Sequence, residues 1–180
     1  MAWTKTKMAI AAGVVVILTA GTVTTFVIYQ PHLPKARPLP STQTDFPRSS
    51  WNFAGFGDPR SAFMSYMWAS ICQSNRPVFE ASLTPSQKTL YRQMIAMNMK
   101  VSQPHSEAAA VADVFKRADG EWQNGRFRLI DEQATAADQV LLHLEAQKPN
   151  GHMEVYIRMR KLGNEWKFDG PQKRQIPATS

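Results

Sequence analysis

Two neighbouring stretches in the second half of the chain carry side chains that suit proton transfer or partner binding. They are His143, Glu145, Glu154, Tyr156, Arg158 and Arg160. A carboxylate beside an imidazole can act in general acid–base catalysis, and tyrosine and arginine are frequent anchors in protein interfaces. Because these residues alternate with apolar ones, we expect them to share one face of a β-sheet.

The elements that would position these side chains are four predicted strands between residues 126 and 170, where the hydrophobic pattern has a period of two. An Asn-Gly pair at 150–151 suits a type I′ hairpin turn, and a Gly-Asn pair at 163–164 suits a type II′ turn. Loops at these positions would place Leu144 opposite Ile157, Leu142 opposite Met159, and Met159 opposite Phe168.

This register separates two faces of the predicted sheet. The apolar face would collect Phe127, Leu129, Val140, Leu142, Leu144, Val155, Ile157, Met159 and Phe168. The polar face would collect Arg126, Arg128 and Lys167 with the six residues named above. A slip of one residue would exchange the faces, so the separation supports the pairing. Asp131 has the parity of Leu129, which predicts an inward carboxylate at the end of its strand.

Helical patterns precede the strands. Asp58 before Pro59, and Thr84 before Pro85, are typical N-caps, and Gln87 completes a capping box with Thr84. Ser106 is a third N-cap candidate. Helices followed by an antiparallel meander with one apolar face indicate an α+β domain, in which helices pack on one face of a curved sheet of about four strands.

The stretches "DPRSAFMSYMWA", "FEASLTPSQ" and "RMRKLGNEWKFDGP" resemble the nuclear transport factor 2-like superfamily, a cystatin-like α+β cone, and in particular its small bacterial membrane-linked members of unknown function. The resemblance covers about residues 52–171. It implies a cone that either holds an inward carboxylate, often with a His or Tyr, for proton transfer or serves as a non-catalytic binding domain.

The sequence favours the non-catalytic alternative, because the predicted interior offers few convergent polar groups. No catalytic residue is assigned. Asp113 and Tyr66 lie on predicted helices, and the sequence pattern leaves open whether each points toward the interior or toward solvent. The four histidines show no metal-ligand spacing, and no glycine-rich phosphate loop is present, so we expect no metal and no cofactor. A small hydrolase or isomerase using an inward carboxylate is the alternative.

Residues 8–29 are uncharged and predict a transmembrane helix. At about 1.5 Å per residue, this 22-residue stretch would span roughly 33 Å, enough to cross a bilayer core of about 30 Å. A cleaved signal, which would leave a secreted soluble binding domain, is the alternative. Small residues at 9, 13, 21 and 25 also suit helix association in the membrane.

Charge and proline content divide the rest of the chain. The net charge is +7, and residues 1–49 carry five lysines or arginines against one aspartate. This distribution favours lipid headgroups over nucleic acid. The segments are a basic tail at 1–7, the transmembrane helix at 8–29, a Pro-rich linker at 30–50, the cone at 51–171 and a tail at 172–180.

These observations predict a single-pass membrane protein with its amino terminus inside and its α+β domain outside the cytoplasm, in the periplasm. The domain would bind a protein partner or an apolar ligand. The predicted contact surface for a partner, or for a second copy of the chain, is the polar sheet face at His143, Tyr156, Arg158 and Arg160.

Overall fold

The computed structural model describes residues 15–19, 22–26, 34–37, 39, 42–72, 75–149 and 151–172. The chain divides into two compact units, Met1–His32 and Leu33–Ser180. Each unit is described by itself.

The first unit contains a pair of antiparallel strands, β1 (Val15–Thr19) and β2 (Thr22–Phe26), with Val15 opposite Phe26. The sequence predicted a helix over 8–29, and the structure does not support it, because these ten positions form strands instead; the rest of that stretch lies outside the described residues. Valine, isoleucine and threonine are branched at Cβ, which favours the extended backbone. No helix among the described residues has the length and apolar character needed to cross a membrane.

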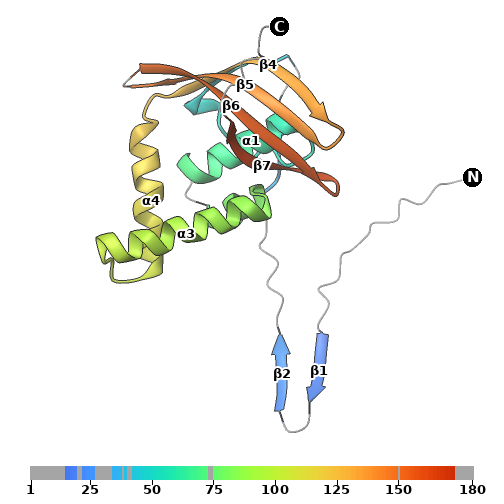
Figure 1. Cartoon of the computed structure of the whole chain (residues 1–180), viewed down its shortest axis with the longest axis vertical. Coiled ribbons are helices and arrows are strands. Elements are labelled where there is room, and N and C mark those ends of the chain that lie inside the picture. Colours follow the sequence, from blue (N-terminus) through green and yellow to red (C-terminus); the bar gives the residue numbers. More distant parts are fainter. Residues whose placement is uncertain are drawn as a thin grey trace, which may run out of the picture. The chain divides into compact units, whose positions relative to one another are not determined.

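The second unit is an α+β domain built on a five-stranded antiparallel sheet in the order β3-β4-β5-β6-β7. Its helices gather on one side of the sheet, where α1 packs against β5, β6 and β7 (Figure 1). The strands are β3 (Asp45–Pro47), β4 (Arg126–Ala136), β5 (Gln139–Lys148), β6 (Gly151–Leu162) and β7 (Glu165–Gln172). The helices are α1 (Pro59–Met67), η2 (Trp68–Cys72), α2 (Arg76–Ser82), α3 (Pro85–Ser102) and α4 (Glu107–Glu121).

The extra strand comes from the end of the predicted linker. Phe46 of β3 lies opposite Phe127 and is buried, and the amide of Leu129 donates to the carbonyl of Thr44 at 2.7 Å. A 3-10 turn, η1 (Arg48–Ser50), then leads into the core at Trp51. Proline is tolerated here because β3 is an edge strand, where an amide can go unpaired. The domain therefore begins earlier than residue 51.

The first hairpin has a register two residues away from the predicted one. Leu144 lies opposite Val155, not Ile157, and Leu142 lies opposite Ile157, because Lys148 pairs with Gly151 and the loop falls one residue earlier than predicted. A shift of two keeps every side chain on its face, so the apolar and polar faces remain as predicted. The second hairpin confirms the prediction, with Met159 opposite Phe168.

A β-bulge in β4 overturns the prediction for Asp131. Leu129 lies opposite Leu144, but Asp131 lies opposite His143, so the parity of the strand changes between them. A bulge inserts one unpaired residue and turns the following side chains to the other face. Asp131 is consequently exposed on the side of His143, and the predicted inward carboxylate is absent at that position.

All three predicted N-cap positions are confirmed, and two of them carry the expected side-chain hydrogen bond. Asp58 accepts from the amide of Ser61 at 2.8 Å, and Ser106 accepts from the amide of Ala109 at 3.2 Å. Thr84 precedes α3 as predicted, but its side chain makes no capping hydrogen bond. The capping-box prediction is therefore wrong, for a reason given below.

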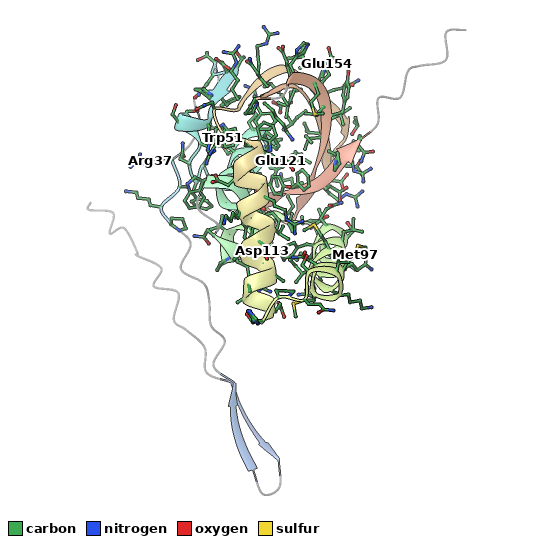
Figure 2. The ribbon with its side chains drawn as sticks, turned by 90° about the vertical axis from the view of Figure 1, so that its left-hand side faces the viewer. Arg37, Trp51, Met97, Asp113, Glu121 and Glu154 are labelled. Atoms are coloured by element: carbon green, nitrogen blue, oxygen red, sulfur yellow. The ribbon has the colours of Figure 1, made fainter. Side chains whose placement is uncertain are left out.

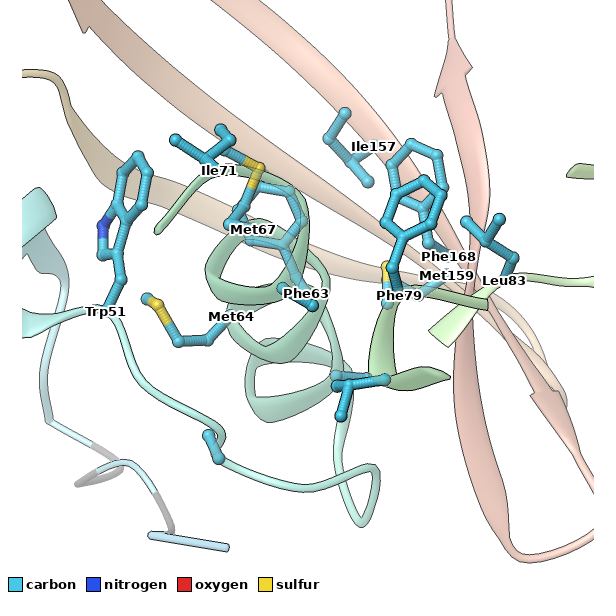
Figure 3. Close-up of a cluster of buried hydrophobic side chains, with 14 of the residues drawn as sticks. Trp51, Phe63, Met64, Met67, Ile71, Phe79, Leu83, Ile157, Met159 and Phe168 are labelled. Atoms are coloured by element: carbon cyan, nitrogen blue, oxygen red, sulfur yellow. The ribbon is translucent and has the colours of Figure 1, made fainter. Parts of the chain in front are cut away.

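The core lies between α1 and the apolar sheet face. Both layers contribute large aromatic side chains to it. Figure 3 shows Phe63 and Met67 of α1 in one cluster with Phe79, Ile157 and Phe168, and Met64 on the side of α1 toward Trp51. Phe63 packs edge-on against Phe127 with ring centroids 5.2 Å apart. Such edge-to-face contacts add to the free energy gained by burying the rings.

Candidate functional site

The polar sheet face brings together three of the predicted residues. The rings of His143 and Tyr156 stack with centroids 4.3 Å apart, and His143 Nε2 lies 3.2 Å from Glu154 Oε2. Glu145 instead forms an ion pair with Arg128. Glu154 is exposed, so its carboxylate remains solvated and its Coulomb interaction with His143 is weak. These residues form a solvated surface cluster.

Arg158 and Arg160 turn toward a buried carboxylate that the sequence reasoning missed. Arg158 Nε donates to Asp169 Oδ2 at 2.6 Å, and Arg160 Nε lies 3.6 Å from the same oxygen. Asp169 is 4% exposed. Both arginines predicted to contact a partner are thus directed to a residue of their own domain.

The same carboxylate explains the start of α3. Thr84 Oγ1 donates to Asp169 Oδ1 at 2.9 Å, and Gln87 Nε2 donates to the Asp169 carbonyl at 3.2 Å. Both side chains that would have formed the capping box are therefore used to join α3 to β7. The one sequence signal for this junction between α3 and β7 was the pair Asp169-Gly170 inside a predicted strand, because Asp-Gly pairs favour bends. We call Thr84, Gln87, Arg158 and Asp169 the Asp169 cluster.

An apolar cavity of about 350 Å³ lies between the helices and the sheet. Its walls come from α1, η2, α2, α3, α4 and strands β4 to β7. The helical wall includes Phe63, Tyr66, Met67, Ile71, Phe79, Val114, Phe115 and Ala118, and the sheet contributes Phe127, Ala146, Val155, Ile157 and Phe168. A one-turn π-helix, the conformation of η2, is uncommon and is often found at functional sites.

The cavity opens at its rim between α3 and the ends of β6 and β7. Met94 and Met153, both lining residues, are 44% and 51% exposed, and Pro171 beside them is also exposed. Lys148 lines the cavity as well, with Nζ 3.1 Å from Glu121 Oε2 and 4.7 Å from the centroid of the Trp122 ring. A small molecule can therefore enter from solvent past flexible methionine side chains.

Four lining residues carry polar side-chain groups: Tyr66, Ser70, Lys148 and, through its indole N–H, Trp122. Ser70 donates to the carbonyl of Met67 at 3.3 Å, and Lys148 is paired with Glu121. The Tyr66 ring stacks on Phe168 with centroids 4.0 Å apart and planes 3° from parallel. Burial raises the pKa of the Tyr66 phenol to about 12, so the hydroxyl keeps its proton at neutral pH.

The predicted candidates for proton transfer do not meet in this cavity. Asp113 on α4 and Glu154 on the sheet are exposed (Figure 2), and Asp131 is exposed as well. Of these candidates, Tyr66 is the one that lines the cavity. No aspartate, glutamate or histidine belongs to the cavity lining found among the described residues. In that part of the chain, His, Cys, Asp and Glu form no group able to hold a metal ion. The arrangement can bind an apolar molecule and offers it a phenolic hydroxyl.

No protein-family model, curated protein or solved structure matches this chain. The resemblance to the nuclear transport factor 2-like superfamily stays a prediction from three sequence stretches. Function must be argued from the cavity and its surroundings, since fold alone does not assign it.

Proposed function

We propose that this chain is a membrane-anchored binding domain whose cavity holds a small apolar molecule outside the cytoplasm. The observation that carries the proposal is the open cavity of about 350 Å³, walled by aromatic and aliphatic side chains. Sites for small molecules are typically about 300–1,000 Å³, mostly apolar, with few polar groups. Each Å² of apolar ligand surface removed from water contributes about 25 cal/mol to binding.

Rigidity of the wall supports a binding role. Phe79 contacts Tyr66, Tyr91 and Phe115 through ring pairs with centroids 5.0–5.5 Å apart. Interlocked rings of this kind resist collapse into the empty space, so the cavity is preformed and a ligand loses less free energy to reorganisation.

The proposal of a membrane anchor rests on the uncharged residues 8–29 and on the absence of hydrogen-bond partners for the backbone in lipid hydrocarbon. A two-stranded sheet leaves unpaired amide and carbonyl groups along both outer edges, and hydrocarbon offers these groups no partner. A helix pairs the backbone groups within one segment, and an isolated hairpin is marginal in water. We therefore propose that this stretch becomes helical where it meets a bilayer.

Binding is tested by nuclear magnetic resonance of full-length protein in lipid nanodiscs, labelled with ¹³C at the methionine methyls and titrated with toluene. Met67, Met94 and Met153 line the cavity, whereas Met64 and Met97 do not. We expect saturable shifts at the first three methyls. Shifts at all five that rise linearly with toluene would indicate partition into lipid and contradict the proposal.

A matched pair of substitutions locates the site. Ala146→Phe puts a ring into the cavity from β5, and Ala134→Phe puts the same ring on an exposed position of β4. The first variant should lose the saturable shifts and the second should keep them. Equal binding by both variants would place toluene elsewhere.

A further inference from the structure

The Tyr66 hydroxyl has no hydrogen-bond partner among the described residues, and Tyr66 lines the cavity. Arg60 is the one described residue with interactions beyond those named, so Tyr66 has none of that kind. The buried side-chain atoms without a partner belong to Asn52, Ser61, Tyr91 and Arg160. The Tyr66 oxygen is outside this set, so it retains accessible surface.

Because Tyr66 is a lining residue, we infer that this accessible surface faces the cavity. The phenol ring is enclosed by Phe63, Phe79 and Phe168, with centroids at 6.5, 5.5 and 4.0 Å, and Tyr66 is a lining residue. A phenol O–H left unpaired in apolar surroundings costs free energy, which an oxygen acceptor on a ligand would recover.

The charges around the cavity exclude one kind of acceptor. The one cation among the described lining residues is Lys148, and its ammonium is already 3.1 Å from the Glu121 carboxylate. A ligand carboxylate would enter an apolar space with that cation's charge already balanced, so its desolvation would go uncompensated. A neutral carbonyl oxygen accepts a hydrogen bond at a far smaller desolvation cost.

We propose that the ligand is an apolar molecule with one neutral carbonyl group, a ketone, aldehyde or ester, whose oxygen accepts a hydrogen bond from Tyr66. This inference rests on the proposed function and narrows it to one chemical class. Tyr66 then determines specificity, because a ligand without an acceptor leaves the hydroxyl unpaired when it displaces water from the cavity.

The test compares three water-soluble ring compounds of similar size: toluene, acetophenone and benzoate. Dissociation constants come from the methionine methyl shifts of the full-length protein in nanodiscs. We expect acetophenone to bind about three- to tenfold more tightly than toluene, the range for a net neutral hydrogen bond, and benzoate to bind more weakly than acetophenone. Toluene and acetophenone binding equally would overturn the inference and leave the proposed function standing.

Tyr66→Phe is the matched variant, since it removes the hydroxyl and keeps the ring stacked on Phe168. Its preference for acetophenone should fall to about one, and its toluene affinity should rise, because the variant has no hydroxyl for toluene to leave unpaired. A preference that survives in Tyr66→Phe overturns the role of Tyr66. As a readout independent of the variant's folding, the ¹³Cζ resonance of Tyr66 in the unmutated protein should move with acetophenone and not with toluene. Binding of none of the three compounds would instead reject the proposed function itself.

Discussion

Arg158 Nε donates to Asp169 Oδ2 at 2.6 Å at the bulge where the register between β6 and β7 shifts, between Ile157 and Met159. The carboxylate is nearly inaccessible, while the Arg158 side chain is 35% exposed. Asp169 also accepts from Thr84, so one carboxylate joins the sheet to the start of α3. Removing the partly exposed Arg158 side chain and removing the buried Asp169 carboxylate should therefore change the free energy of unfolding by different amounts.

Arg158→Ala should lower the free energy of unfolding by about 1–3 kcal/mol, because the buried Asp169 carboxylate loses its 2.6 Å hydrogen bond and keeps only the more distant guanidinium of Arg160, 3.6 Å away. Urea unfolding followed by tryptophan fluorescence measures the loss. The control is Arg128→Ala, whose arginine is 61% exposed in its pair with Glu145 and should cost less than about 1 kcal/mol. Equal losses in the two variants would contradict the assigned role of Asp169.

Gly170→Ala should destabilise the same region. Gly170 has φ +102°, and a Cβ there would lie 2.7 Å from Gln87 Nε2, the group that donates to the Asp169 carbonyl. Gly163→Ala is the control, with φ +62° and open space around the added methyl. We expect a loss of about 1–3 kcal/mol at Gly170 and about 1 kcal/mol at Gly163. A larger loss at Gly163 would show that contact with Gln87 is unimportant.

Alkaline pH should destabilise the domain through Tyr66. The folded-state pKa is about 12 against an ordinary value near 10, so the folded state holds its proton where the unfolded state has lost it. The stabilisation is complete below pH 10 and is lost as pH rises toward 12, on the order of 1–3 kcal/mol in total. Denaturation at a series of pH values measures this slope, which Tyr66→Phe should reduce. An unchanged slope in the variant would remove Tyr66 as its cause.

Filling the cavity from α4 should raise stability and block binding together. Ala118→Leu adds apolar volume at a lining position, and we expect a gain of about 0.5–2 kcal/mol with loss of toluene binding. Ala112→Leu adds the same group at an exposed position of α4 and should change neither quantity much. Thermal unfolding and the methyl titration measure both effects. Destabilisation by Ala118→Leu with binding retained would argue against usable space at this wall.

Membrane anchoring is tested by a charge placed in the apolar stretch. Ile17→Lys should release the protein from membranes into the soluble fraction on alkaline carbonate extraction, since a central lysine disfavours insertion by about 2.5–3.5 kcal/mol on translocon scales. Ile17→Leu is the control and should stay with the membrane. Release of the unmutated chain by the same treatment would reject the anchor, and its recovery with a new amino terminus beyond Ala20 would identify a cleaved signal.

Local patterns in the sequence were sufficient for the α+β class, the two sheet faces and the caps at Asp58 and Ser106. Alternation and capping depend on neighbours within a few residues, which is why they can be read from the chain. The face assignment tolerated the error at the first hairpin because the true register differs by an even number.

The tertiary structure alone decided the positions of Asp131, Asp169 and Tyr66. A bulge turned Asp131 outward, and a contact between residues 84 and 169 drew Thr84 away from its cap. The cavity beside Tyr66 exists because side chains from helices and strands far apart in sequence enclose a space that none of them fills. Such features depend on how separate elements pack together, and packing is set by the whole domain.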